Sequence, residues 1–165
     1  MYRTTRLPLS FQTSRIASRA AEVAVHYRHP YIDHAHFLLA FLEVPNDAIQ
    51  AILSKHLGSA PGLRESTVGF LESLHSLAEP SPRSLPHTKR MGAILDLAQD
   101  EAIRRDAPSI SPGHLFLALA TEDLMTEAER GSVSSRLLAP TGLALIDIRG
   151  LLFPTSKLPT SPHDD

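Results

Sequence analysis

Two stretches of the sequence decide the fold, and they read alike. Residues 30–43 are PYIDHAHFLLAFLE, and residues 108–121 are PSISPGHLFLALAT. Each begins with proline, has an isoleucine two residues later and a histidine six residues later, and continues as an apolar run. The two histidines, His36 and His114, are 78 positions apart. This self-similarity predicts that one helical unit is present twice in the chain.

The repeat extends well beyond these stretches. At the spacing of 78 positions the two halves also align Ile16 with Ile94, Ala20 with Ala98, Glu22 with Asp100, Ala24 with Ala102, Leu39 with Leu117, and Ala40 with Ala118. Farther along, at a spacing of 84, Leu53 aligns with Leu137 and Gly58 with Gly142. The second copy therefore carries about six extra residues, and we expect them in the polar stretch around 124–134.

The first copy begins with two predicted helices of different character. In the first helix apolar residues recur at helical spacing after a cap at Thr13 or Ser14, and Pro30 is expected to end it. Asp33 is expected to cap a short helix over 34–43. Because that helix is apolar on nearly every side, it should lie buried at the centre of its half.

The remaining helices follow the same reasoning. A third helix is predicted over about 45–56 and a fourth over about 61–77. In the second copy Thr88 is expected to cap a helix closed by Pro108, and Ser111 with the proline after it to start the buried helix. The predicted fold class is all-α, with eight helices in two pseudo-symmetric four-helix repeats.

We predict one folded domain over residues 13–153. Its parts are repeat one over 13–77, a linker over 78–86, and repeat two over 87–153. Three prolines in the linker exclude a helix there. A flexible arm is expected over 1–12 and a disordered tail over 154–165. Residues 1–21 are basic and hold no acid, as in organelle transit peptides, but import is the minor interpretation because the helical pattern starts within them.

Bulk composition narrows the function classes. The chain has 165 residues, no cysteine and a formal net charge of −2. The lack of cysteine excludes disulfides and thiol catalysis, and the charge does not indicate a nucleic-acid partner. No apolar stretch reaches the ~18 residues of a membrane helix, and no G-x-x-x-x-G-K-[ST] loop is present. We therefore expect a cytoplasmic protein, or one of a plastid or other organelle if the source is eukaryotic, with neither nucleic acid nor membrane as partner.

The repeated pattern resembles the Clp N-terminal domain that precedes the ATPase modules of AAA+ unfoldases such as ClpA, ClpB and ClpC. The residues that carry the resemblance are Asp100-Glu101-Ala102, Ile110, Ser111-Pro112-Gly113-His114-Leu115 and, in the first copy, Ile32-Asp33-His34-Ala35-His36-Phe37-Leu38-Leu39. The match covers most of the chain and is found in both copies. The resemblance implies a double Clp-N motif that docks other proteins.

Without ATPase modules, the resemblance implies a non-catalytic accessory, adaptor or regulator of an AAA+ Clp protease or chaperone system. The expected partners are the Clp unfoldase, Clp peptidase subunits or client proteins, with no cofactor. A different interpretation is a small-ligand or modified-peptide decoy that protects an unfoldase without joining it. A metal-dependent hydrolase ranks third, and we assign no catalytic residue.

One family site departs from the pattern. In proteins of the ClpC type, the resemblance implies a phosphoarginine site made by an acidic residue before each histidine and a nearby threonine. This chain has Ala35 and Gly113 at the acidic positions, while Thr88 and, as its counterpart, Ser10 hold the hydroxyl positions. The missing carboxylates remove the paired recognition of a guanidinium, which argues against phosphoarginine binding.

Arginines of the first helix in each copy are the remaining candidates for binding. The side chains expected on its exposed side are Arg15, Arg19, Tyr27, Arg28 and His29 in the first copy, and Arg104 and Arg105 in the second. Ordinary solvation of a helix face is the simplest interpretation of such charges. A partner-docking face is the functional alternative.

The nine histidines raise the question of a metal site. His26, His29, His34 and His36 are close in sequence. However, His34 and His36 are two residues apart and do not share a helix face. His36 also matches His114, which has no histidine neighbours. We therefore interpret His36 and His114 as structural residues at helix starts, and we predict no metal.

Overall fold

The computed structural model describes residues 6–47, 49–50, 52, 60–80, 82, 84–124, 137–138 and 145–154. Within them the helices are α1 Phe11–His26, α2 His34–Glu43, α4 Ala60–Ser73, α5 Lys89–Arg104, α6 Pro112–Leu124 and α7 Leu145–Leu152. These ranges form no strand, so the chain is all-α as predicted. The count of eight helices is not confirmed. The helix predicted over 45–56 is described only in part, at four helical residues, and its counterpart in the second copy lies largely outside the described residues.

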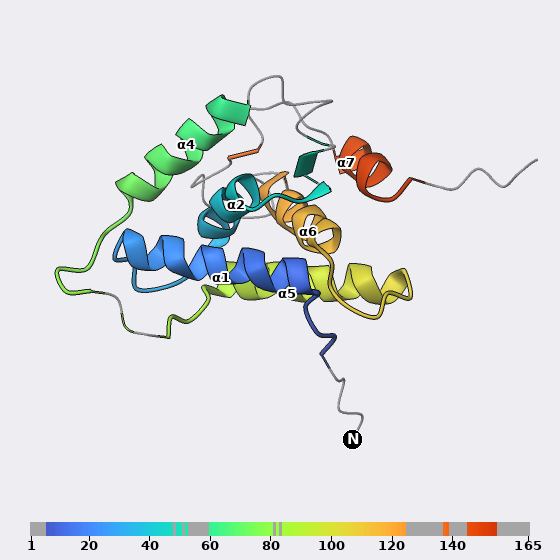
Figure 1. The fold of residues 1–165 in the computed structure, drawn as a ribbon, viewed down its shortest axis with the longest axis horizontal. Coiled ribbons are helices and arrows are strands. Elements are labelled where there is room, and N and C mark those ends of the chain that lie inside the picture. Colours follow the sequence, from blue (N-terminus) through green and yellow to red (C-terminus); the bar gives the residue numbers. More distant parts are fainter. Residues whose placement is uncertain are drawn as a thin grey trace, which may run out of the picture.

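Each half is a layered packing of its own helices. In Figure 1, α1 and α5 lie along one side of the molecule, while α2 and α6 lie at its centre. α2 packs between α1 and α4, and α6 packs between α5 and α7. The central helices are the apolar runs of the two repeated stretches, and nearly every side chain in them is buried. Across the centre the rings of Phe41 and Phe116 meet edge to face at 5.4 Å, joining the two halves in one core.

Equivalent residues start the first helix of each half. Ser10 caps α1 through its Oγ, which accepts from the backbone N of Thr13. Thr88 caps α5 in the same extended conformation and accepts from Met91 N, as predicted. The prediction that Thr13 or Ser14 caps α1 is wrong, because the helix begins at Phe11 and the Thr13 side chain is buried.

The first helices also end alike, before their prolines are reached. α1 ends at His26 and α5 at Arg104, each followed by a residue with positive φ: Arg28 at 56° and Asp106 at 51°. The backbone N of His29 then donates to Ala24 O, and Ala107 N donates to Ala102 O. A left-handed residue after the last turn is a common helix stop, so the turn rather than Pro30 or Pro108 ends these helices.

Short backbone bridges tie the two halves together reciprocally. Leu9 pairs with Ile110, and His87 pairs with Ile32. Ser10 N donates to Ile110 O at 3.0 Å, and Thr88 N donates to Ile32 O at 3.0 Å. Leu9 and His87 hold equivalent positions in the two copies, as do Ile32 and Ile110. The same contact is therefore made twice, once from each half to the other. Pro8 and Ser10 of the predicted arm and Pro86 of the predicted linker take part in the hydrogen bonds of these bridges.

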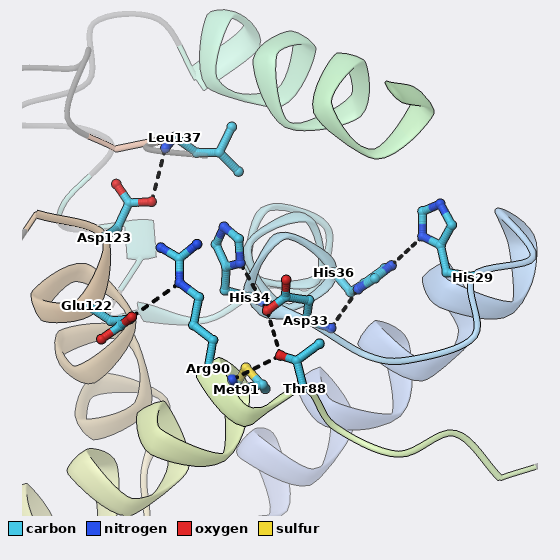
Figure 2. Close-up of polar contacts among 10 residues, drawn as sticks. All are labelled: His29, Asp33, His34, His36, Thr88, Arg90, Met91, Glu122, Asp123 and Leu137. Carbon is cyan, nitrogen blue, oxygen red and sulfur yellow. Dashed lines mark hydrogen bonds and ion pairs between the residues drawn. The ribbon is translucent and has the colours of Figure 1, made fainter. Parts of the chain in front are cut away.

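A buried carboxylate on one side of the expected insertion is hydrogen-bonded to the backbone on its other side. Asp123, near the end of α6, is 1% exposed and accepts from the backbone N of Leu137 and of Leu138, at 3.0 and 2.8 Å. Figure 2 shows the bond from Leu137. Residues 125–136, which include most of the expected insertion, lie outside the described residues. Asp123 therefore fixes the point at which the chain returns to the core.

Candidate functional site

The hydroxyl position of the second copy lies at the junction of the two halves. Thr88 donates its Oγ1 hydrogen to Asp33 Oδ1 at 2.8 Å, and the same carboxylate accepts from His34 N (Figure 2). Burial opposes ionisation of Asp33, but hydrogen bonds and charge interaction with His34, and the bond from Thr88, outweigh it and hold its pKa well below the ordinary value. Thr88 is thus engaged in joining the halves. Its counterpart Ser10 bonds locally, to Thr13 Oγ1 at 2.8 Å.

A chain of hydrogen bonds holds His36. Its Nδ1 accepts from Asp33 N at 2.8 Å, so in the neutral ring the proton is on Nε2. That Nε2 lies 2.7 Å from Nδ1 of His29, and the two rings point toward one another in Figure 2. His29 is 1% exposed, so the prediction that it decorates the exposed side of the first helix is wrong. It follows the helix, where the chain turns inward.

Burial lowers the pKa of both rings. The pKa of His36 falls to about 4, first because of burial and second because of its charge interaction with His29. Burial also lowers the pKa of His29, against a backbone hydrogen bond with Leu71. His36 Nδ1 accepts from an N–H donor and would lose this bond if it were protonated. The contact therefore favours the neutral form of the ring.

The second copy uses different side chains at the same place. His114 Nδ1 accepts from Ser111 N at 3.0 Å, and its ring stacks on Phe153 at 5.2 Å. The guanidinium of Arg105 lies 3.7 Å from the centre of the Phe153 ring. In the first copy Tyr27, the repeat position of Arg105, stacks on His29 in turn at 5.6 Å. Each helix-start histidine is therefore covered by a ring, and each ring by the side chain at position 27 or 105.

Ala35 and Gly113, the positions where the family resemblance implies acidic residues, are both buried. Ala35 is 0% exposed. A Cβ on Gly113 would lie 3.4 Å from Cζ of Phe153 and 3.8 Å from Leu152 Cδ2. Both distances are ordinary van der Waals contacts, so a Cβ fits at position 113, which also lines a hollow of about 320 Å³.

Two of the predicted arginines lie together on the outer face of α1. A hollow of about 440 Å³ is lined by Phe11, Ser14, Arg15, Ser18, Arg19, Glu22 and Val44. We call it the α1 groove. Phe11 is 79% exposed, although large apolar side chains are normally covered. Arg28 is not part of the groove, since its guanidinium donates to Ala78 O at the far end of α1.

The other two predicted arginines lie together on α5. Arg104 and Arg105 face Glu101, and Arg149 of α7 reaches the same carboxylate. The four side chains line a second hollow of about 310 Å³. Arg149, Phe11 and Phe153 are not among the residues predicted from the sequence. Of these three residues, Phe11 alone could have been suspected from its neighbours in sequence, because it is an aromatic residue next to the serine that caps α1.

The described ranges contain no group of three or more His, Asp or Glu side chains placed to hold a metal. The histidines that are close in sequence do not gather in one cluster. His29 and His36 contact each other, whereas His34 contacts Asp33, with 3.1 Å between Nδ1 and Oδ1. His26 lies on the exposed surface of α1. Over the part of the chain that the structure describes, no helix is long and apolar enough to cross a membrane.

Comparisons with known proteins agree with this architecture. The family model of the Clp repeat N-terminal domain matches residues 9–129. The chain therefore belongs to the Clp repeat N-terminal domain family, as the sequence predicted. No curated protein sequence matches the chain.

Solved structures of related fold come from several Clp-type chaperones. The N-terminal domain of Hsp104 from Candida albicans is 15% identical with a TM-score of 0.72, covering 89% of this chain and 90% of that one. The N-terminal domain of ClpD from Arabidopsis thaliana is 16% identical with a TM-score of 0.62, covering 92% and 96%. A ClpV N-domain in complex with a VipB peptide is 18% identical with a TM-score of 0.63, covering 87% and 86%.

Proposed function

We propose that this chain is a non-catalytic protein-binding module, which serves as an accessory or adaptor of an AAA+ Clp system and docks its partner in the α1 groove. The observation that carries the proposal is Phe11, which is 79% exposed at the edge of a hollow of about 440 Å³. An exposed aromatic anchor beside arginine is the composition typical of protein interfaces.

The charges of the α1 groove favour a partner with an acidic side chain near an apolar one. Arg19 is already committed, since its guanidinium contacts Glu43 at 2.6 Å and Glu22 at 2.9 Å. Arg15 is exposed and makes no ion pair with the described residues. A partner would therefore place an apolar side chain on Phe11 and an acceptor on Arg15.

The fold relatives support a peptide or protein as ligand. A ClpV N-domain of the same fold forms a complex with a VipB peptide. The polar groups at the junction of the halves are engaged in structural bonds, with Thr88 donating to Asp33 and His36 bonded at both ring nitrogens. This favours binding over catalysis.

The decoy alternative finds less support. A decoy of the phosphoarginine type needs a carboxylate at positions 35 and 113, and this chain has Ala35 and Gly113 there. The groups that a modified arginine would pair with are therefore absent from the place where the family resemblance puts them.

The test is direct binding of the full chain to the purified Clp ATPase and Clp peptidase of its own organism, measured by biolayer interferometry. We expect one of them to bind. Phe11→Ala should weaken that binding at least about tenfold, because it removes the exposed anchor. Ile146→Ala is the matched control, since Ile146 is also 79% exposed but lies on α7. It should change the affinity by less than about twofold.

Both substitutions are on the surface and should alter the free energy of unfolding by less than about 0.5 kcal/mol. If neither Clp component binds the folded chain, the accessory role is wrong, and small ligands or modified peptides become the next probes. If binding occurs but the two variants weaken it equally, the α1 groove is not the docking site.

A further inference from the structure

The duplication places an equivalent cleft in each half, between its first and fourth helices. In the first copy the cleft lies among α1, α2 and α4, has a volume of about 220 Å³ and includes Arg19, Tyr27, Glu43 and Arg64. In the second copy it lies between α5 and α7, with a volume of about 310 Å³. We call this second hollow, lined by Glu101, Arg104, Arg105 and Arg149, the basic cleft.

Repeat positions support the equivalence. Arg105 occupies the position of Tyr27, 78 residues earlier. Arg64 and Arg149 each follow a buried residue of the fourth helix, Leu63 at 4% and Ile148 at 0% exposure. Both arginines reach back to a carboxylate of their own half.

The guanidinium groups in the cleft of the first copy are paired at short distances, although Glu43 is the one carboxylate among the described residues that line it. Arg19 contacts Glu43 at 2.6 Å and Glu22 at 2.9 Å, and Arg64 contacts Glu43 at 3.1 Å. Two guanidinium groups therefore meet two carboxylates at short distances. Little hydrogen-bonding capacity is left for a charged ligand.

The basic cleft is not balanced. Among the described residues, Glu101 is the single carboxylate that lines it. It contacts Arg104 at 3.2 Å, Arg105 at 3.6 Å and Arg149 at 3.8 Å. Each guanidinium has five N–H donors, whereas one carboxylate has about four acceptor sites, so donors remain unused. The side chains of Arg104 and Arg149 are 67% and 53% exposed. The three cations and one anion leave an excess of positive charge in a chain whose net charge is −2.

We propose that the basic cleft binds an acidic segment of a partner protein, whose Asp or Glu carboxylates accept paired hydrogen bonds from Arg104 and Arg149. Guanidinium and carboxylate match in geometry, and two such forks in one hollow fit neighbouring carboxylates of a peptide. A small basic patch on a chain with net negative charge can orient an acidic segment of a protein. Nucleic-acid sites differ, because they normally extend over a whole basic face. The basic cleft shares no lining residue with the α1 groove and is assigned independently of it.

The test uses a fluorescein-labelled peptide in which glutamate alternates with alanine, followed by fluorescence anisotropy with the full chain at low salt. A peptide with glutamine in place of glutamate is the neutral probe. We expect the acidic peptide to bind and the neutral one not to bind. The double variant Arg104→Glu with Arg149→Glu should weaken binding at least about tenfold. The control, Arg6→Glu with Lys89→Glu, changes the net charge equally at exposed positions and should leave binding within about twofold.

A third variant tests the carboxylate that competes with the peptide inside the cleft. Glu101→Gln removes the competing carboxylate, so the acidic peptide should bind about threefold more tightly. Circular dichroism checks the fold, and Arg104→Gln with Arg149→Gln replaces the charge reversal if that variant does not fold.

Three results would overturn the proposal. The first is no binding of the acidic peptide. The second is equal weakening by the control pair, which would mean that net charge alone acts. The third is tighter binding of a single-stranded DNA oligonucleotide that is lost in the same arginine variants, which would make the cleft a nucleic-acid site. Because Phe11 is unchanged throughout, failure here leaves the α1 groove untouched.

Discussion

At the scale of single residues, the histidine that begins each central helix has the same local bond and a different neighbour. His36 and His114 each accept a backbone N–H at Nδ1. Nε2 of His36 is hydrogen-bonded to Nδ1 of His29, whereas the ring of His114 stacks on Phe153. The duplication has kept the helix start and changed the ring that covers it.

The His29–His36 pair predicts a loss of stability in mild acid. The folded state holds His36 neutral, with a pKa of about 4, while the unfolded chain titrates near 6.5. The unfolded state therefore binds more protons between these values, and stability falls as the pH falls from about 6.5 toward 4. We expect a loss of about 2 kcal/mol between pH 6.5 and 5, measured by urea unfolding.

The control for this prediction is His36→Gln, whose amide oxygen can still accept from Asp33 N. Its unfolding free energy should depend less on pH than that of the native chain. Some dependence should remain, because burial also lowers the pKa values of His29, His87 and His114. Asp33 changes the unfolding free energy with pH only below its ordinary pKa of about 3.8, because its pKa in the folded state is lowered. An unchanged slope in the variant would contradict the assignment.

At the scale of elements, the caps of α1 and α5 are equivalent in position and unequal in their contacts. Ser10 and Thr88 share one extended conformation and one bond to the first turn of the helix. Thr88 alone also donates to the partly buried carboxylate of Asp33, 55 residues away in sequence. The second cap therefore stabilises both its own helix and the start of α2.

This difference predicts unequal costs for the same change. Ser10→Ala should lower the free energy of unfolding by about 1 kcal/mol, the ordinary value of a cap. Thr88→Ala should lower it by about 2 kcal/mol, because Asp33 also loses a donor. Urea unfolding at pH 7 measures both. Equal losses would mean that the bond between Thr88 and Asp33 contributes nothing to stability.

At the scale of the whole molecule, the two halves behave as one unit because they share a core and exchange backbone bridges. Phe41 and Phe116 meet at the centre, with 1% and 2% exposure. The bridges from Leu9 to Ile110 and from Ile32 to His87 cross between the halves twice. Neither half can lose its central helix without exposing the other.

We therefore expect one cooperative unfolding transition for the domain. Phe116→Ala should destabilise it by about 3–5 kcal/mol without splitting the transition. In a double-mutant cycle with Phe41→Ala, the coupling between the two rings should be about 1 kcal/mol. Circular dichroism and calorimetry supply the two probes. Separate transitions for the halves, or independent effects of the two substitutions, would contradict a shared core.

Much of the fold could be predicted from local patterns. The spacing of 78 residues revealed the duplication, the apolar runs marked α2 and α6, and Asp33, Thr88 and Ser111 marked helix starts. The apolar runs and helix starts depend on residues within one or two turns of each other, and the duplication is a direct comparison of the sequence with itself, so the sequence carries all of them. The start of α1 was misplaced because Ser10, Thr13 and Ser14 are all acceptable caps, and burial of Thr13 decides among them.

The all-α character and the Clp repeat pattern of this protein can be read from the sequence, because helix periodicity is local and the repeat is seen when the sequence is compared with itself. Which side chains face one another is known from the packed structure alone. Packing buried His29 against His36, stacked Arg105 on Phe153, and brought Arg149 to Glu101 across 48 residues of sequence. The physical reason is that such contacts arise where separate helices pack, and no periodicity within one helix records which neighbour it meets.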